Sequence, residues 1–143
     1  MNAAAVVENE VEIRRSLEEV FDYSTDLTRE HEWNPKTRRV EKLTDGPIGA
    51  GTPFEATFLK GNPMTIEVVR FERPRMWESV GRSRRLEATT QGSVTATQDG
   101  ARLTMRMELR PRHVPRLLLP LLARHMHRQQ ERNLAAIKAV LER

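Results

Sequence analysis

The C-terminal stretch, residues 114–143, constrains the fold more than any other part of the chain. Pro115 can open a helix, because it lacks only a backbone N–H that the first turn leaves without a partner. A helix over residues 116–143 would be roughly 42 Å long at about 1.5 Å per residue. An element of that length has to pack against something extended. Pro120 lies within the first two turns, and we expect it to bend the helix or delay its start.

One apolar stripe follows the predicted helix and indicates the face that packs against the rest of the chain. Its members recur at helical spacing: Leu118, Leu121, Leu122, Met126, Ala136, Ile137, Val140 and Leu141. The stripe fades between His127 and Asn133, where the residues are almost wholly polar.

The N-terminal third predicts one strand and two short helices. Apolar residues alternate with glutamates over residues 7–13, which is typical of a half-buried strand. Ser16 and Glu19 have the spacing of a capping box, so a helix should begin there. A second short helix over residues 28–33 should stop before Pro35, because proline disfavours helix in the residue that precedes it.

The centre of the chain predicts strands joined by tight turns, and therefore an antiparallel meander. Gly49 and Gly51 are expected to need positive φ in the first hairpin. After Val68 the apolar residues change parity, which a β-bulge would explain. The expected strands cover residues 40–43, 54–58, 64–68, 76–81, 86–97 and 102–110.

These elements predict an α+β fold in a single domain over residues 1–143. Each strand has one apolar face, so the sheet needs a cover on one side only, and the C-terminal helix is the element long enough to provide it. The order is β-α-α-β6-α, with a curved antiparallel sheet of about seven strands wrapped around the long helix. A pocket should open where the sheet and the helix separate.

Composition excludes several classes of function. The chain has no cysteine, which removes disulfides, thiolate metal sites and a cysteine nucleophile. Arginine dominates its 24 basic residues, but these are interleaved with 20 acidic residues, so a nucleic-acid surface is disfavoured against an ordinary solvated one. The most apolar run, residues 117–123, is too short to span a bilayer, and nothing at the N-terminus resembles a signal peptide. We expect a cytoplasmic protein.

No motif predicts a metal or a cofactor. His125 and His127 are two residues apart on a helix and point to opposite sides, so they cannot chelate one ion. The glycines at positions 46, 49 and 51 lie in a hairpin rather than before a helix, which disfavours a phosphate-binding loop. No nucleophilic triad can be assembled from the sequence, and we expect no metal and no cofactor.

Three segments resemble the SRPBCC superfamily, the START and Bet v 1-like group with the helix-grip fold. They are VFDYSTDLTREHEWNP (residues 20–35), the glycine hairpin GPIGAGTPF (residues 46–54) and the final LAAIKAVLER (residues 134–143). The polyketide cyclase/dehydrase-like branch fits best. The resemblance implies a deep hydrophobic cavity between sheet and helix, a site that the group uses for lipids, polyketides and other apolar ligands.

Candidate site residues follow from that placement. The side chains expected to line the cavity are Trp33, Phe54, Phe58, Trp77, Met105, Met107, Leu118, Leu122, His125 and Gln129. Each aromatic or methionine could equally be ordinary core. The candidates for acid–base chemistry are His125, His31 and Arg70, and a solvent-exposed histidine is the alternative interpretation of His125.

Three hypotheses for function remain. The first is a carrier or binding module for a small hydrophobic ligand, without chemistry of its own. The second is a cyclase, aromatase or dehydratase that uses a cavity histidine or arginine as acid or base. The third is a protein- or nucleic-acid-interaction module that uses the arginine-rich exterior. The sequence allows either a monomer or a homodimer.

Overall fold

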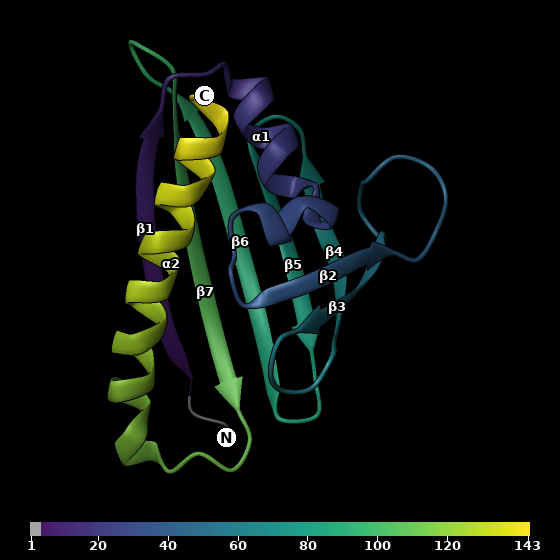
Figure 1. Ribbon diagram of the computed structural model, residues 1–143, viewed down its shortest axis with the longest axis vertical. Helices are drawn as coiled ribbons and strands as arrows, with labels where there is room; N and C mark the ends of the chain where they lie inside the picture. The colour runs from purple at the N-terminus through teal and green to yellow at the C-terminus, as the bar shows by residue number, and fades with distance from the viewer. Residues whose placement is uncertain (1–3) are drawn as a thin grey trace.

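A seven-stranded antiparallel sheet and one long helix dominate the protein, whose computed structural model describes residues 4–143 (Figure 1). The strands lie in the order β1-β7-β6-β5-β4-β3-β2, so every chain neighbour from β2 to β7 is also a sheet neighbour. The strands are β1 (Ala5–Ile13), β2 (Thr37–Lys42), β3 (Pro53–Phe58), β4 (Met64–Glu72), β5 (Met76–Arg82), β6 (Leu86–Ala96) and β7 (Ala101–Pro111). The helices are α1 (Leu17–Thr25), η1 (Leu27–Glu32), η2 (Arg116–Leu118) and α2 (Leu119–Leu141). The predicted fold class and element order are confirmed.

The strands follow the period-two pattern of the sequence. In β7, for example, Ala101, Leu103, Met105 and Leu109 are buried on the face that the helices cover. The predicted bulge is present, because the register of β4 against β5 shifts between Val68 and Arg70. The hairpin before β3 differs from expectation in one respect. Positive φ occurs at Gly46 and Gly51 but not at Gly49.

Ser16 caps α1 as predicted, but Glu19 bonds to the Ser16 hydroxyl and not to its backbone N–H as in a full capping box. The Glu19 backbone N–H donates to Ser16 Oγ at 3.2 Å, and Ser16 Oγ donates to Glu19 Oε1 at 3.1 Å. Phe21 on the inner face of α1 meets the ring of Trp77 edge-on, with centroids 5.7 Å apart. Helix α1 therefore fixes the position of Trp77 in the sheet below it.

Helix α2 starts later than residue 116, as Pro120 predicts. Residues 116–118 form the short turn η2, and Pro120 occupies the first turn of α2, where its missing N–H costs no hydrogen bond. The helix packs along β1, and its buried residues are Gln130, Leu134 and Ile137 (Figure 1). Leu118 and Leu121, which we expected in the buried stripe, are 49% and 63% exposed, because this end of α2 projects past the apolar face of the sheet. No helix in the described part of the chain is long and apolar enough to cross a membrane.

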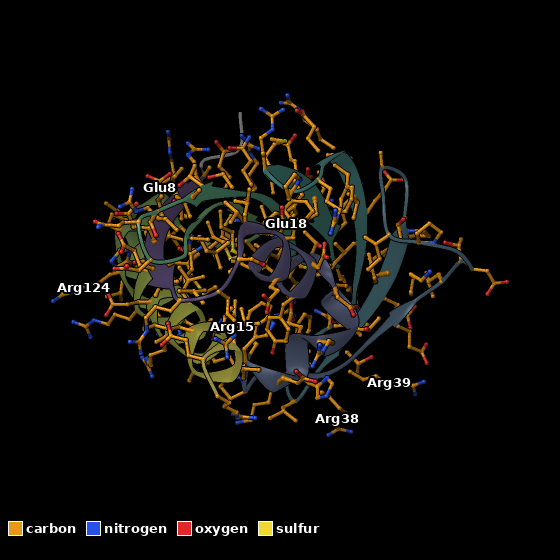
Figure 2. The ribbon with its side chains drawn as sticks, turned by 90° about the horizontal axis from the view of Figure 1, so that it is seen from above. Glu8, Arg15, Glu18, Arg38, Arg39 and Arg124 are labelled. Atoms are coloured by element: carbon orange, nitrogen blue, oxygen red, sulfur yellow. The ribbon has the colours of Figure 1, made fainter. Side chains whose placement is uncertain are left out.

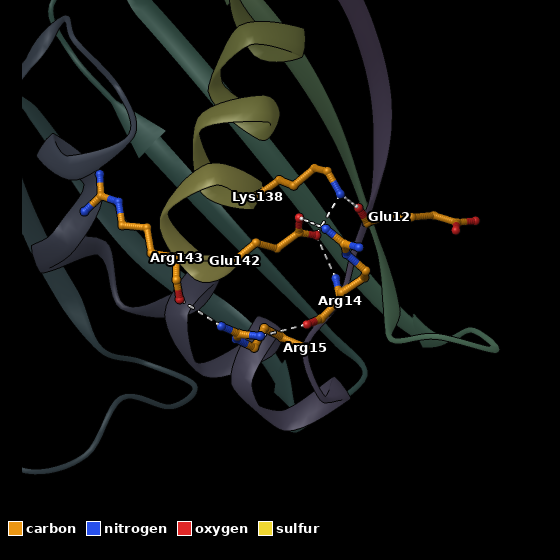
Figure 3. Close-up of polar contacts among 6 residues, drawn as sticks. All are labelled: Glu12, Arg14, Arg15, Lys138, Glu142 and Arg143. Atoms are coloured by element: carbon orange, nitrogen blue, oxygen red, sulfur yellow. Dashed lines mark hydrogen bonds and ion pairs between the residues drawn. The ribbon is translucent and has the colours of Figure 1, made fainter.

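Polar contacts fix the other end of α2 (Figure 3). Glu142 Oε2 accepts from the Arg14 backbone N–H at 2.9 Å and from Lys138 Nζ at 2.7 Å. Lys138 Nζ also donates to the Glu12 carbonyl at 2.8 Å, and Arg15 Nη2 donates to the Arg143 carbonyl at 3.1 Å. The last turn of the helix is thus tied to the end of β1 and the start of α1.

Glu142 gives this tie a measurable pH dependence. The hydrogen bonds from Lys138 and Arg14 lower the pKa of its carboxyl from the ordinary 4.5 to about 2. A lowered pKa contributes stability above pH 4.5, and that contribution is lost as the pH falls toward 2. We expect Glu142→Gln to be less stable than the wild type at pH 7, with the difference shrinking between pH 4.5 and 2 in urea titrations. Equal stability at pH 7 would contradict this role.

Candidate functional site

A cavity of about 500 Å³ lies between the concave face of the sheet and the helices η1 and α2. It is partly open to solvent, and its surface is mostly apolar. Strands β3 to β7 contribute its floor and walls, and α2 forms the opposite side. The volume falls within the range of roughly 300–1,000 Å³ that is typical of small-molecule sites.

Sulfur-containing and aromatic side chains form the apolar wall. Four of the six methionines in the chain line the cavity, together with Phe58 and Trp77. The four are Met64, Met105, Met107 and Met126. Methionine is unbranched and polarisable, so such a wall adapts to apolar molecules of differing shape.

Two glycines leave room for this wall. A Cβ at Gly92 would lie 2.2 Å from the ring of Trp77, which is itself 3% exposed and held by Phe21. A Cβ at Gly81 would lie 2.6 Å from Met64 Sδ, whose side chain is flexible. The ring of Trp77 on β5 therefore lies over the backbone of β6 at Gly92, its cross-strand partner, where a larger residue would collide with it.

Polar side chains gather where η1 and the start of β2 face α2. Lys36 Nζ donates to Gln129 Oε1 at 3.0 Å and lies 3.4 Å from His125 Nε2. Gln130 Oε1 accepts from Asn9 Nδ2 at 2.8 Å, which ties α2 to β1. Lys36, Gln129 and Gln130 all line the cavity, as do Glu30 and Asn133. We call these five residues the polar end of the cavity.

Glu30 is the residue of the polar end whose chemistry is most altered. Its carboxyl Oε2 accepts from Thr37 Oγ1 at 2.6 Å. Burial raises the pKa of the Glu30 carboxyl above the ordinary 4.5, and the hydrogen bond from Thr37 opposes this shift. Glu30 as a whole residue is half-buried and lines the cavity, while its carboxyl is desolvated enough for burial to raise the pKa.

Three buried polar atoms near this end have no hydrogen-bond partner in residues 4–143. They are Ser24 Oγ, Trp33 Nε1 and Gln130 Nε2, and all three belong to residues that line the cavity. A buried donor without a partner costs about 1–3 kcal/mol. Because neighbouring atoms cover these three, a ligand oxygen reaches them only after a side chain rotates.

Six of the residues expected at the site line the cavity: Trp33, Phe58, Trp77, Met105, Met107 and Gln129. Phe54 does not, because it is fully buried beneath the sheet edge with Val40, Ala56, Ile66 and Val68. Leu118, Leu122 and His125 line a separate, more open hollow on the outside of α2.

The other two acid–base candidates lie outside the cavity lining. His31 is exposed, because the turn of η1 that directs Glu30 inward directs its neighbour to solvent. Arg70 follows the β4 bulge on the outer face of the sheet, where it pairs with Glu72.

Sequence reasoning missed Glu30, Gln130, Asn133, Met64 and Met126 as lining residues. The two methionines had a signal in the sequence, because Met64 belongs to an alternating strand and Met126 belongs to the apolar stripe of the C-terminal helix. The polar residues had a signal as well: the stripe of α2 fades between His127 and Asn133, which is where the helix passes the cavity. Glu30 had no such signal. Within residues 4–143, no three His, Cys, Asp or Glu side chains come together as a metal site would require.

The chain belongs to the family described as polyketide cyclase / dehydrase and lipid transport, whose model matches residues 4–142. This agrees with the resemblance seen in the sequence. Among curated proteins, none matches the chain.

Solved structures share the helix-grip fold at low sequence identity. A START superfamily protein from Mycobacterium smegmatis is 14% identical, with a TM-score of 0.81 over 96% of this chain and 97% of its own. The Zhui aromatase/cyclase from Streptomyces sp. R1128 is 16% identical, with a TM-score of 0.77 over 99% of this chain and 95% of its own. A Thermus thermophilus protein is 15% identical, with a TM-score of 0.78 over 94% of both chains.

The raised pKa of Glu30 predicts a specific pH effect. A carboxyl with a raised pKa contributes stability that is present below the ordinary value of 4.5 and is lost as the pH rises through the folded-state value. The variant Glu30→Gln keeps an acceptor for Thr37 but cannot ionise. We expect its stability relative to the wild type to increase as the pH rises from 4.5, measured by urea unfolding. The matched control is Glu55→Gln, an exposed carboxylate on β3, and the same trend in that variant would contradict the assignment.

Proposed function

We propose that this protein binds a small, mainly apolar molecule that carries a hydrogen-bonding oxygen. The observation that supports this most directly is the cavity itself: about 500 Å³, with a methionine and aromatic wall and a distinct polar end. The family description, which includes lipid transport, and the aromatase/cyclase among the structural neighbours support the same class of ligand.

The two ends of the cavity suggest how such a molecule is oriented. Its apolar part would lie among the methionines and against Trp77, where burial contributes about 25 cal/mol per Å². Its oxygen would lie near Lys36 and Gln129, which offer N–H donors, and near Glu30, whose carboxyl can donate only in its protonated form. A few placed polar groups in an apolar pocket set the direction of a ligand more than its affinity.

Filling the cavity tests this proposal. Ala88 on β6 is 8% exposed and lines the cavity, so Ala88→Phe should project a ring into it. We expect binding of the amphiphilic anionic dye 1-anilinonaphthalene-8-sulfonate, followed by fluorescence titration, to weaken at least about tenfold. The control is Ala96→Phe, the same change at an exposed position of the same strand. Unchanged binding by the Ala88 variant would contradict the cavity as the site.

Native mass spectrometry of freshly purified protein addresses the identity of the ligand. A retained apolar adduct in the wild type that is lost in Ala88→Phe would support binding in the cavity. An adduct kept equally by both proteins would place it elsewhere.

A second candidate function is acid–base catalysis in the same cavity, and Glu30 is the observation that favours it. A carboxyl that stays protonated at higher pH than usual can donate a proton to a departing hydroxyl or to a carbonyl oxygen. His125, His31 and Arg70 lie outside the lining, so Glu30 has the better position for this role.

The rate of a model ring closure distinguishes acid–base catalysis from ligand binding alone. A linear 1,3,5-triketone can close by an intramolecular aldol condensation that releases one water. If the protein is an enzyme of this type, it should accelerate that closure, and Glu30→Gln should lower the rate about 100-fold or more while dye binding persists. If the wild type does not accelerate the closure, this candidate fails for that substrate class, and the binding function stands on the dye titration.

A further inference from the structure

One end of the molecule presents an apolar tip to solvent. The tip is formed by the connection from β7 to α2 and the first turns of that helix, at the opposite end from the C-terminus (Figure 1). Its members are Val114, Leu117, Leu118 and Leu121, which are 36%, 91%, 49% and 63% exposed. We call these four residues the leucine tip. Apolar side chains that cluster at one exposed place typically indicate a contact surface.

Local structure explains why the tip is exposed. The chain turns at His113, which has φ of +66°, and then passes through Pro115 and η2 before α2 begins. Leu122 and Met126 point back to the sheet and pack against Ala88 and Leu109. The residues of the leucine tip lie before α2 or, for Leu121, on its exposed face, and their side chains stay accessible to solvent.

The surroundings of the leucine tip are strongly basic. Five arginines and a single acidic residue, Glu131, lie between Arg112 and Arg132. None of the five arginines pairs with a carboxylate in the described residues 4–143. Arg124, Arg128 and Arg132 line the hollow beside Leu118 and Leu121, and Figure 2 shows Arg124 pointing away from the core.

We propose that the leucine tip and its arginines dock on an anionic lipid surface. Apolar side chains beside unpaired basic ones, on a helix that starts at the surface, suit the boundary between headgroups and acyl chains. A second copy of this chain fits less well, because a symmetric contact would bring the same arginines face to face. An acidic protein would satisfy the charges. Leu117, however, protrudes and is 91% exposed, and a fluid lipid surface can surround such a side chain without a preformed pocket.

The docking surface lies next to the cavity. Leu122 lines the outer hollow and also packs against Ala88 and Leu109, both of which line the cavity from the other side. Docking would therefore bring the apolar part of the cavity close to the lipid. The proposal depends on the exterior alone, and it stands or falls separately from ligand binding in the cavity.

Vesicle sedimentation at low ionic strength tests the docking. The full chain is mixed with vesicles of phosphatidylcholine and phosphatidylglycerol, or of phosphatidylcholine alone. We expect binding to the anionic vesicles only, weakening steeply as salt is added. The double variant Leu117→Ser, Leu121→Ser should bind at least about tenfold more weakly. Its matched control is Leu43→Ser, Leu59→Ser, two leucines that are 51% and 57% exposed elsewhere on the molecule.

The arginines are tested in the same assay. Arg124→Gln, Arg128→Gln should weaken binding about tenfold or more, whereas Arg38→Gln, Arg39→Gln on β2 should leave it nearly unchanged. Circular dichroism melting and dye binding should be alike in all variants, because every changed side chain is exposed. Equal binding to neutral and anionic vesicles, equal loss in the control variants, or no binding to either vesicle would overturn the proposal. Binding of the wild-type chain to an acidic protein, with none to vesicles, would also overturn it.

Discussion

The contact between α2 and β1 is the constraint on which the rest of the molecule depends. A straight helix cannot cover the whole of a curled sheet, so its packing along β1 leaves space over the strands farther from β1. Leu134 and Ile137 are buried against the sheet, and the contacts of Glu142 and Lys138 hold the C-terminal end of α2 in place. The cavity and the projecting start of α2 are two results of the same geometry.

Polar groups enter this geometry where the apolar packing stops. Gln130 is buried because it bonds to Asn9 on β1, whereas Gln129 bonds to Lys36 on the other side of the helix. Glu30 comes from a different element and has Thr37 as its neighbour. The polar end is thus built from three separate segments, namely η1, the residue before β2, and α2, and its arrangement exists only once the sheet has curled around the helix.

Most of the fold could be predicted from the sequence, since period-two strands, the capping box of Ser16 and the parity change after Val68 are local signals. The site was predictable only in part. Helical spacing places Leu121 and Leu122 near the same face, but it does not say how far the sheet extends beneath them. In the same way, nothing local distinguishes Glu30 from His31, because the direction of each depends on how η1 sits over the sheet. Whether a side chain faces the cavity or the solvent depends on the distances between helices and strands, and a local sequence pattern does not give those distances.

The close approach of the Trp77 ring to Gly92 has a consequence for which ligands the cavity would accept. Trp77 is held between the β6 backbone and Phe21, which makes this part of the cavity wall rigid, whereas the thioether side chains elsewhere in the wall can adapt. The rigid part of the wall at Trp77 would limit the shape of a ligand, and the flexible methionine side chains would adjust to it. The methionine part of the wall would therefore adapt to differences in ligand shape more readily than the part formed by the indole.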